Sequence, residues 1–143
     1  MRCEQVMKRD PRCLGEKDTV QTAAKLMRDQ NIGFIPICGD GGKITGTLTD
    51  RDIVVRLAAE NRPLATPIFS LMSRDPIVCK PKDDLSRAEQ LMEDRQKSRV
   101  VCVDDQGRPI GIISLSDIAQ HEDDGRAGEL LRTITQREVR TAH

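Results

Sequence analysis

The chain has 143 residues, in which 23 Lys and Arg balance 23 Asp and Glu, so its formal net charge is zero. A neutral chain without a basic face is not expected to bind nucleic acid, because counterion release needs clustered cations. Trp and Tyr are absent, and Phe34 and Phe69 are the only aromatic residues, which excludes a stacking platform for single strands. No apolar run is long enough for a bilayer and the N-terminus lacks a signal-peptide core. We therefore expect a cytoplasmic protein that binds neither nucleic acid nor a membrane.

The cysteines fit the same compartment. There are five of them, and none forms a C-x-x-C pair, so the sequence does not suggest a disulfide framework. Cys38 and Cys102 lie in apolar segments, where a free cysteine acts as a small buried hydrophobe. Cys3 is expected to be the most exposed thiol, and no metal site is predicted.

The first half of the chain is predicted to alternate short strands and helices. An entry segment has a short helix at 4–8, a turn at Asp10-Pro11 and a strand at 12–14. A helix capped by Asp18 or Thr19 follows, with apolar residues at helical spacing, and ends near Asn31. The next elements are strands at 34–38 and 43–48, joined by a glycine-rich turn at 39–42, and a helix at 50–60 that buries Ile53, Val54 and Leu57.

The second half is predicted to repeat this order after a linker at 61–68. Its elements are a short helix at 68–72, a strand at 77–79, a helix at 85–96, a strand at 99–103, a turn at 105–107, and a strand from Pro109 that leads into a final helix. Each half is therefore β-α-β-β-α, and the fold class is α/β. Residues 123–143 are expected to add one helix with a frayed end.

The two halves correspond at a constant offset of 65 residues. Met7-Lys8-Arg9-Asp10-Pro11 aligns with Met72-Ser73-Arg74-Asp75-Pro76, and Gly46 aligns with Gly111. Because the period is longer than a solenoid unit and only two copies exist, we predict a tandem pair of small α/β units packed on each other. The predicted boundaries are 5–60 for the first repeat, 66–122 for the second and 123–143 for a helical tail.

The most informative motif occurs once in each half, as Gly46-Thr47-Leu48-Thr49-Asp50-Arg51-Asp52 and Gly111-Ile112-Ile113-Ser114-Leu115-Ser116-Asp117. Thr49 and Ser114 follow an apolar strand and stand where a side-chain oxygen and free backbone N–H groups can meet a phosphate. Asp52 and Asp117 present carboxylates that can accept hydrogen bonds from the vicinal hydroxyls of a ribose. In the alternative interpretation, both motifs are only helix N-caps.

These doubled patterns resemble a tandem pair of CBS domains, often called a Bateman module. The resemblance covers roughly residues 5–122, and Thr-Asp-Arg-Asp-Ile is similar to stand-alone bacterial CBS-pair proteins. It implies two units related by a pseudo-two-fold axis, a homodimer, and a sensor of AMP, ADP, ATP, NAD or S-adenosylmethionine with no obligatory cofactor.

The resemblance also implies two pockets, each drawing on both repeats. In one pocket, Ser114, Ser116 and Asp117 would hold phosphate and ribose, Arg99 would add a cation, and adenine would lie against Arg12 and Ile32-Gly33-Phe34. In the other, Thr49, Arg51 and Asp52 would face Ile77 and Lys97-Ser98-Arg99. Arg12 departs from the small or apolar residue common at its position in the family.

No catalytic constellation accompanies these residues. The sequence contains no HExxH, no Walker loop, and no Cys/His or Ser/His/Asp set, so an enzyme is not expected. The predicted function is an adenosyl-nucleotide-sensing regulatory module that modulates an unidentified effector protein in trans. The alternative is a ligand-independent dimerisation scaffold.

Overall fold

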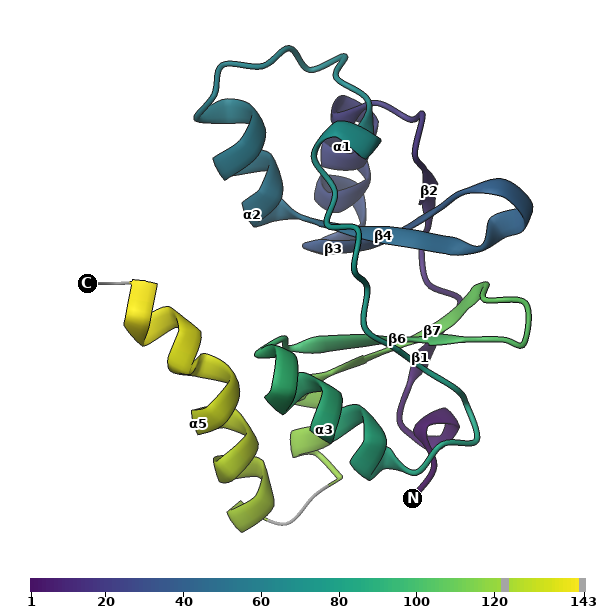
Figure 1. Ribbon diagram of the computed structural model, residues 1–143, viewed down its shortest axis with the longest axis vertical. Helices are drawn as coiled ribbons and strands as arrows, with labels where there is room; N and C mark the ends of the chain where they lie inside the picture. Colours follow the sequence, from purple (N-terminus) through teal and green to yellow (C-terminus); the bar gives the residue numbers. More distant parts are fainter. Residues whose placement is uncertain (122–123, 142–143) are drawn as a thin grey trace. The chain divides into compact units, whose positions relative to one another are not determined.

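The computed structural model describes residues 1–121 and 124–141, which form two compact units (Figure 1). Unit 2 consists of Pro11–Pro76 and Gln106–Pro109. Unit 1 consists of Met1–Asp10, Ile77–Asp105 and the described residues from Ile110 onward. The first ten residues therefore group with the second repeat and not with the first.

Unit 2 is a three-stranded sheet with helices. Its elements are β2 (Leu14–Gly15), α1 (Val20–Gln30), β3 (Phe34–Cys38), β4 (Ile44–Thr49) and α2 (Asp50–Asp52). The strand order is β2-β3-β4, with β2 parallel and β4 antiparallel to β3. Thr19 caps α1 by accepting a hydrogen bond from the Thr22 N–H at 3.2 Å, and Asn31 ends the helix in the left-handed conformation, as predicted. Short 3₁₀ helices occupy Asp40–Gly42 and Ile68–Ser70.

The helix predicted at 50–60 differs from expectation in its geometry. Only Asp50–Asp52 is α-helical, and Ile53–Ala58 is a π-helical stretch in which the Ala59 N–H donates to the Val54 carbonyl at 2.9 Å. Leu57 is buried and Ile53 is half-buried, but Val54 is 62% exposed, so its predicted burial is wrong. The wider turn breaks the 3.6-residue period on which that prediction rested.

Unit 1 has the same β-α-β-β-α order with an added strand and helix, which confirms the α/β class. Its elements are β1 (Lys8–Arg9), β5 (Val78–Cys79), α3 (Leu85–Arg95), β6 (Arg99–Val103), β7 (Pro109–Ser114), α4 (Leu115–Ala119) and α5 (Asp124–Thr141). The strand order is β1-β7-β6-β5. The helix predicted in the tail is confirmed as α5. The last two residues of the tail, 142–143, lie outside the described part of the chain.

The entry segment departs from its predicted structure because it pairs with a distant strand. The short helix predicted at 4–8 is found as a 3₁₀ helix at Cys3–Gln5, and Lys8 belongs to β1, which pairs antiparallel with β7, with Lys8 opposite Ile112. Figure 1 shows β1 beside β7. The strand predicted at 12–14 is found at Leu14–Gly15, where it pairs with β3.

Each copy of Met-x-Arg-Asp-Pro lies at the edge of the unit that contains the other repeat. β1 lies against β7 in unit 1, and in unit 2 Ser73 forms an isolated antiparallel bridge with Thr47. A Cβ at Gly111 would come within 2.5 Å of Met7 Sδ, and a Cβ at Gly46 would come within 2.5 Å of the Ser73 carbonyl oxygen. The close approach of these edges therefore requires glycine at both equivalent positions.

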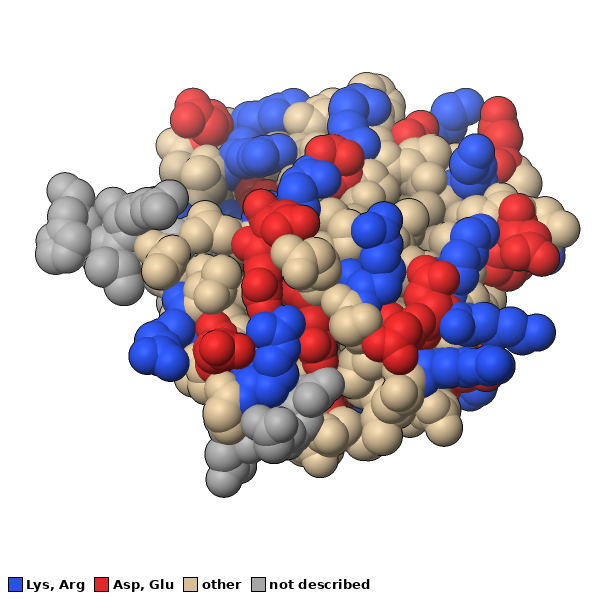
Figure 2. All heavy atoms as spheres, turned by 60° about the horizontal axis from the view of Figure 1, so that its bottom comes forward, with Lys and Arg blue, Asp and Glu red and all other residues tan. Residues whose placement is uncertain are grey.

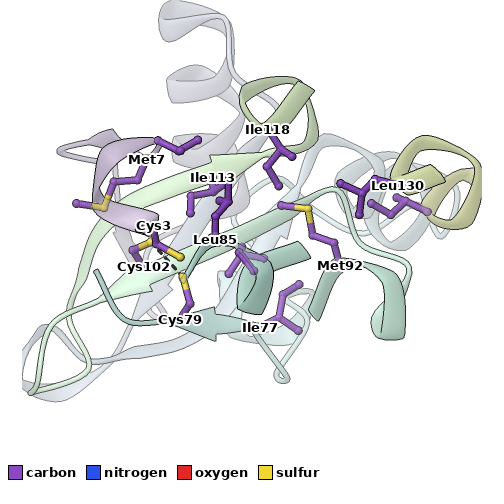
Figure 3. Close-up of a cluster of buried hydrophobic side chains, with 14 residues drawn as sticks. Cys3, Met7, Ile77, Cys79, Leu85, Met92, Cys102, Ile113, Ile118 and Leu130 are labelled. Atoms are coloured by element: carbon purple, nitrogen blue, oxygen red, sulfur yellow. Dashed lines mark hydrogen bonds between the residues drawn. The ribbon is translucent and has the colours of Figure 1, made fainter. Parts of the chain in front are cut away.

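The core of unit 1 contains three of the five free thiols (Figure 3). Cys79 and Cys102 are opposite each other on the parallel strands β5 and β6, with their Sγ atoms 3.2 Å apart. Cys3 joins them and is 0% exposed, so the expectation that it is the most exposed thiol is wrong. Its burial follows from tertiary contacts such as the 2.9 Å hydrogen bond from the Cys3 N–H to the Asp83 carbonyl.

The charged side chains do not separate into regions of one sign on the face that Figure 2 shows, where Lys and Arg alternate with Asp and Glu. None of the helices in the described residues is long and apolar enough to cross a bilayer.

Candidate functional site

The candidate site in unit 1 is built where β7 ends at Ser114 and α4 begins. The backbone of Ser114 is extended, and its Oγ accepts a hydrogen bond from the Asp117 N–H at 3.1 Å. In return, the Ser114 N–H donates to Asp117 Oδ2 at 2.9 Å. Such a reciprocal capping box forms because a hydroxyl at the cap and a carboxylate three residues later satisfy each other's backbone donors. The capping role considered for Ser114 and Asp117 is confirmed.

Asp117 is a buried carboxylate whose two oxygens both have partners. Oδ2 is held by Ser114, and Oδ1 lies 3.5 Å from Lys8 Nζ, on a lysine side chain that is 79% exposed. An exposed ammonium adds little energy to such a pair. The main role of Asp117 in this structure is therefore to hold the backbone of the turn that contains Ser114.

A cavity of about 450 Å³ opens beside this turn, within the range of about 300–1,000 Å³ typical of small-molecule sites. Its polar lining brings together two of the predicted segments: the Leu115 N–H donates to the Ser98 carbonyl at 2.8 Å, and the Oγ atoms of Ser114 and Ser116 are 2.9 Å apart. The residues that line it are Ser98, Arg99, Ser114, Leu115, Ser116, Ala119, Ala127, Gly128 and Leu131. The cavity thus combines hydroxyls and a guanidinium with an apolar surface.

Unit 2 carries the equivalent turn at the end of β4. Thr49 Oγ1 accepts from the Asp52 N–H at 3.1 Å, and the Thr49 N–H donates to Asp52 Oδ2 at 2.9 Å. The Asp50 N–H donates to the Gly33 carbonyl at 3.0 Å, and Phe34 is opposite Thr49 in the sheet. The segments 32–34 and 49–52, which the family resemblance assigned to different pockets, therefore lie together in this unit.

The two turns differ in charge at equivalent positions. Leu115 of unit 1 corresponds to Asp50 of unit 2, whose carboxylate lies over Gly33, so that a Cβ on Gly33 would come within 2.7 Å of Asp50 Oδ2. Arg99 of unit 1 corresponds to Phe34. Ser116 of unit 1 corresponds to Arg51. The turn in unit 1 thus has its cation at Arg99, whereas the turn in unit 2 has its cation at Arg51 and an additional anion at Asp50.

The remaining predicted residues take different positions. Ile77 is buried in unit 1, and its carbonyl accepts from the Val101 N–H at 3.1 Å. Arg12 is exposed in unit 2, two residues before β2, and Arg51 is exposed on α2. Asp117 is not among the residues that line the cavity, although its partner Ser114 is.

Sequence reasoning missed the contribution of the tail. Ala127, Gly128 and Leu131 line the cavity from α5, whereas the prediction assigned the tail no role. The available signal was the helical spacing itself: Leu130 and Ile134 mark a buried face, and Ala127 and Leu131 share a neighbouring face of the same helix. The repeat offers no such signal, because residues 124–141 have no counterpart at the 65-residue offset.

Across residues 1–121 and 124–141, no group of three or more His, Cys, Asp or Glu side chains is arranged to hold a metal ion. His121 Nδ1 lies 2.9 Å from the Asp117 carbonyl oxygen, which is a local helix-end contact.

Comparisons with known proteins identify relatives over most of the chain. The family model described as "CBS domain" matches residues 3–59 and 68–124. The CBS domain-containing protein YhcV of Bacillus subtilis is 37% identical over 122 residues, which cover 85% of this chain and 86% of YhcV. Hypoxic response protein 1 of Mycobacterium tuberculosis is 36% identical over 110 residues, which cover 76% of each chain. The crystal structure of the CBS domain pair of protein MJ0100, solved in complex with 5′-methylthioadenosine and S-adenosylmethionine, matches with a TM-score of 0.76 and 26% identity over 85% of this chain and 98% of that chain.

Proposed function

We propose that this chain, which belongs to the CBS domain family and carries two CBS repeats, binds an adenosyl ligand beside Ser114 and thereby regulates a partner protein. The observation that carries the proposal is the cavity of about 450 Å³ in unit 1, because it adjoins the turn whose sequence indicated a phosphate or ribose site. The complex of MJ0100 with 5′-methylthioadenosine and S-adenosylmethionine supports the ligand class. AMP, ADP, ATP and NAD share the same adenosyl group and stay candidates.

The residues of unit 1 divide into direct and indirect roles. Ser114 and Ser116 offer hydroxyls, and Arg99 offers a guanidinium that suits a phosphate or carboxylate, since its planar fork matches two oxygens. The apolar lining suits the faces of a purine ring. Asp117 acts as a positioning residue: by accepting from the Ser114 N–H, it fixes the backbone on which Ser114 stands.

The turn in unit 2 is proposed as a weaker site for anions. Thr49 and Arg51 offer a hydroxyl and a cation, and Asp52 has an oxygen directed to Arg56 Nε at 3.9 Å. However, the carboxylate of Asp50 lies beside Gly33 and would repel a phosphate there. A neutral adenosyl group without phosphate would meet less repulsion. The expectation that each pocket draws on both repeats remains a prediction from the family resemblance.

Regulation would follow from linkage. A ligand shifts a conformational equilibrium only through its different affinity for the two states, and such coupling is typically about 1–3 kcal/mol. That range changes the affinity for a partner by about one to two orders of magnitude. The partner protein and the predicted homodimer are parts of this proposal that await a binding experiment.

The alternative is a ligand-independent scaffold, and one observation favours it. In both units, the capping hydroxyl and the carboxylate satisfy each other's N–H groups without any ligand. The caps therefore explain the Thr49/Asp52 and Ser114/Asp117 pairs by themselves. They do not explain the cavity or the position of Arg99 on its wall.

Thermal unfolding with AMP, ATP, NAD and S-adenosylmethionine separates the two functions. A ligand at about one hundred times its Kd adds roughly 2.7 kcal/mol to the free energy of unfolding, which raises Tm by several degrees for a chain of this size. Ser116→Asp places an anion in the cavity and should remove the shift caused by AMP or ATP. Its matched control is Ser70→Asp, the same change at an exposed serine of unit 2 that does not line the cavity, which should leave that shift unchanged. If none of the four compounds raises Tm, the scaffold is the better account.

A further inference from the structure

We propose that the C-terminal helix α5 forms one wall of the adenosyl site in unit 1 and that Gly128 sets the width of the site. This inference rests on the proposed function and extends it, because it assigns the determinant of ligand size to a segment outside both repeats. The α5 side of the cavity is formed by Ala127, Gly128 and Leu131. Among the described elements of unit 2, none corresponds to α5.

The position of α5 is fixed by contacts along its length. Arg126 Nε lies 3.1 Å from Glu89 Oε2, and Arg126 Nη2 lies 2.7 Å from Glu93 Oε1, so the start of α5 is tied to α3. One turn further, Leu130 is 0% exposed, and Figure 3 shows it directed toward the core near Met92. Ile134 continues this buried face. These contacts place α5 in unit 1 without help from a ligand.

The residues that line the cavity lie on a second face of the same helix. Positions 127 and 131 are one turn apart and about 100° around the helix from 126 and 130. Anchoring and lining are therefore separate tasks of α5, and a change on the lining face does not remove an anchor.

The chemistry of this second face suits a planar apolar group. Leu131 is 53% exposed and adds a large aliphatic side chain to the wall of the cavity. Ala127 and Gly128 present almost no side chain, so a ring can approach the helix closely. With Arg99, Ser114 and Ser116 on the other walls, the cavity offers polar contacts for a ribose, phosphate or carboxylate and apolar contacts for a purine.

A substitution at Gly128 can test whether α5 forms a wall of the site. An added Cβ at Gly128 would meet no other described atom within 4 Å, apart from its chain neighbours and the backbone of its own helix, and its φ is not in the left-handed region. Gly128 itself lines the cavity, so a larger side chain at 128 enters open space at this wall without forcing the backbone. The substitution should also favour the helix, since glycine is a poor helix former.

The experiment is isothermal titration of the full chain with S-adenosylmethionine and with AMP. Gly128→Leu should weaken binding of whichever compound the wild-type chain binds by about tenfold or more, because it fills the cavity. Gly128→Ala should weaken it by less than about threefold, since a methyl group occupies little of the space. Gly125→Leu, the same change at an exposed position of α5 that does not line the cavity, is the matched control and should bind as the wild type does.

Circular dichroism and Tm without ligand check that all three variants keep the fold. If Gly128→Leu is folded and binds as well as the wild type, α5 is not a wall of the site, while the proposed function stands. If the wild-type chain binds neither of these two compounds nor ADP, ATP or NAD, the proposed function fails and this inference fails with it. If Gly125→Leu weakens binding as much as Gly128→Leu does, the inference is also overturned, because the effect would then come from a change in the helix and not from the cavity.

Discussion

Ser114 and Asp117 hold each other by two hydrogen bonds, from the Ser114 N–H to Oδ2 at 2.9 Å and from the Asp117 N–H to Oγ at 3.1 Å. The same pair of bonds joins Thr49 and Asp52 in the other unit. The aspartates are thus part of the backbone structure of both turns. The position of the Ser114 hydroxyl on the cavity wall therefore depends on a carboxylate that does not itself line the cavity.

Removal of either aspartate should destabilise its own unit. Asp117→Ala and Asp52→Ala each leave a cap N–H without its carboxylate, which costs about 0.5–2 kcal/mol of unfolding free energy. The cost should be greater for Asp117, whose side chain is 10% exposed against 15% for Asp52. Urea unfolding measures both variants. Two variants as stable as the wild type would show that the capping boxes carry no energy.

The equivalent glycines should tolerate alanine unequally. In Gly46→Ala the new Cβ meets the Ser73 carbonyl oxygen at 2.5 Å, and this atom belongs to the backbone of a paired edge. In Gly111→Ala the new Cβ meets Met7 Sδ at 2.5 Å, which can move because methionine is flexible. We expect a loss of about 1–3 kcal/mol for Gly46→Ala and a smaller loss for Gly111→Ala, measured by urea unfolding. A greater loss for Gly111→Ala would contradict the described edge of unit 2.

The ion pairs of Arg126 should matter more than those on the surface. Glu89 is 4% exposed, so Arg126→Met would leave a buried carboxylate without this cation. Breaking a fully buried ion pair costs about 3 kcal/mol or more of unfolding free energy. The cost should be smaller here, because Arg126 is 30% exposed. Arg132→Met, at an exposed position of the same helix, should change stability by less than about 0.5 kcal/mol. Adding Glu89→Gln to Arg126→Met should restore part of the loss. Equal stability of the two single variants would contradict the described docking of α5.

The buried Cys102 thiol should make the protein less stable at high pH. A hydrogen bond with Cys3, together with burial, raises the pKa of Cys102 from 9.0 to about 12. Between these two values the unfolded chain has lost the Cys102 proton while the folded chain retains it, so the free energy of unfolding falls as pH rises. This one thiol contributes a slope of at most about 1.4 kcal/mol per pH unit above pH 9 and none well below it.

Urea unfolding under reducing conditions at several pH values from 8 to about 11 measures that slope. The comparison of wild type with Cys102→Ala isolates the thiol, because every other ionisable group is present in both proteins. The variant should show the smaller decline. An identical decline in both proteins would mean that Cys102 ionises equally in the folded and unfolded chains.

The sequence predicted the features that depend on neighbouring residues. The caps at Thr49 and Ser114, the α1 cap at Thr19 and the left-handed end at Asn31 follow from side chains that bond backbone groups a few positions away. The 65-residue repeat added the correct order of strands and helices, because both copies had to satisfy one pattern.

Features that depend on distant contacts were not predictable in the same way. Cys3 is buried because its segment joins the unit of the second repeat, and the predicted helix does not continue to Lys8 because β7 offers β1 a pairing edge. The exposure of Val54 follows from a π-helical turn that a 3.6-residue pattern does not contain. The α5 side of the cavity required the docking of the tail, which no second copy in the chain could indicate.

The most direct test of the account is hydrogen exchange of the full chain with and without saturating S-adenosylmethionine or AMP. We expect slower exchange of amides at 98–99 and 114–119, together with amides of α5 around 127–131, and a smaller change at 32–34 and 49–52. That pattern would establish an adenosyl site beside Ser114 with α5 as its wall. Unchanged exchange throughout, or protection confined to 32–34 and 49–52, would contradict the account.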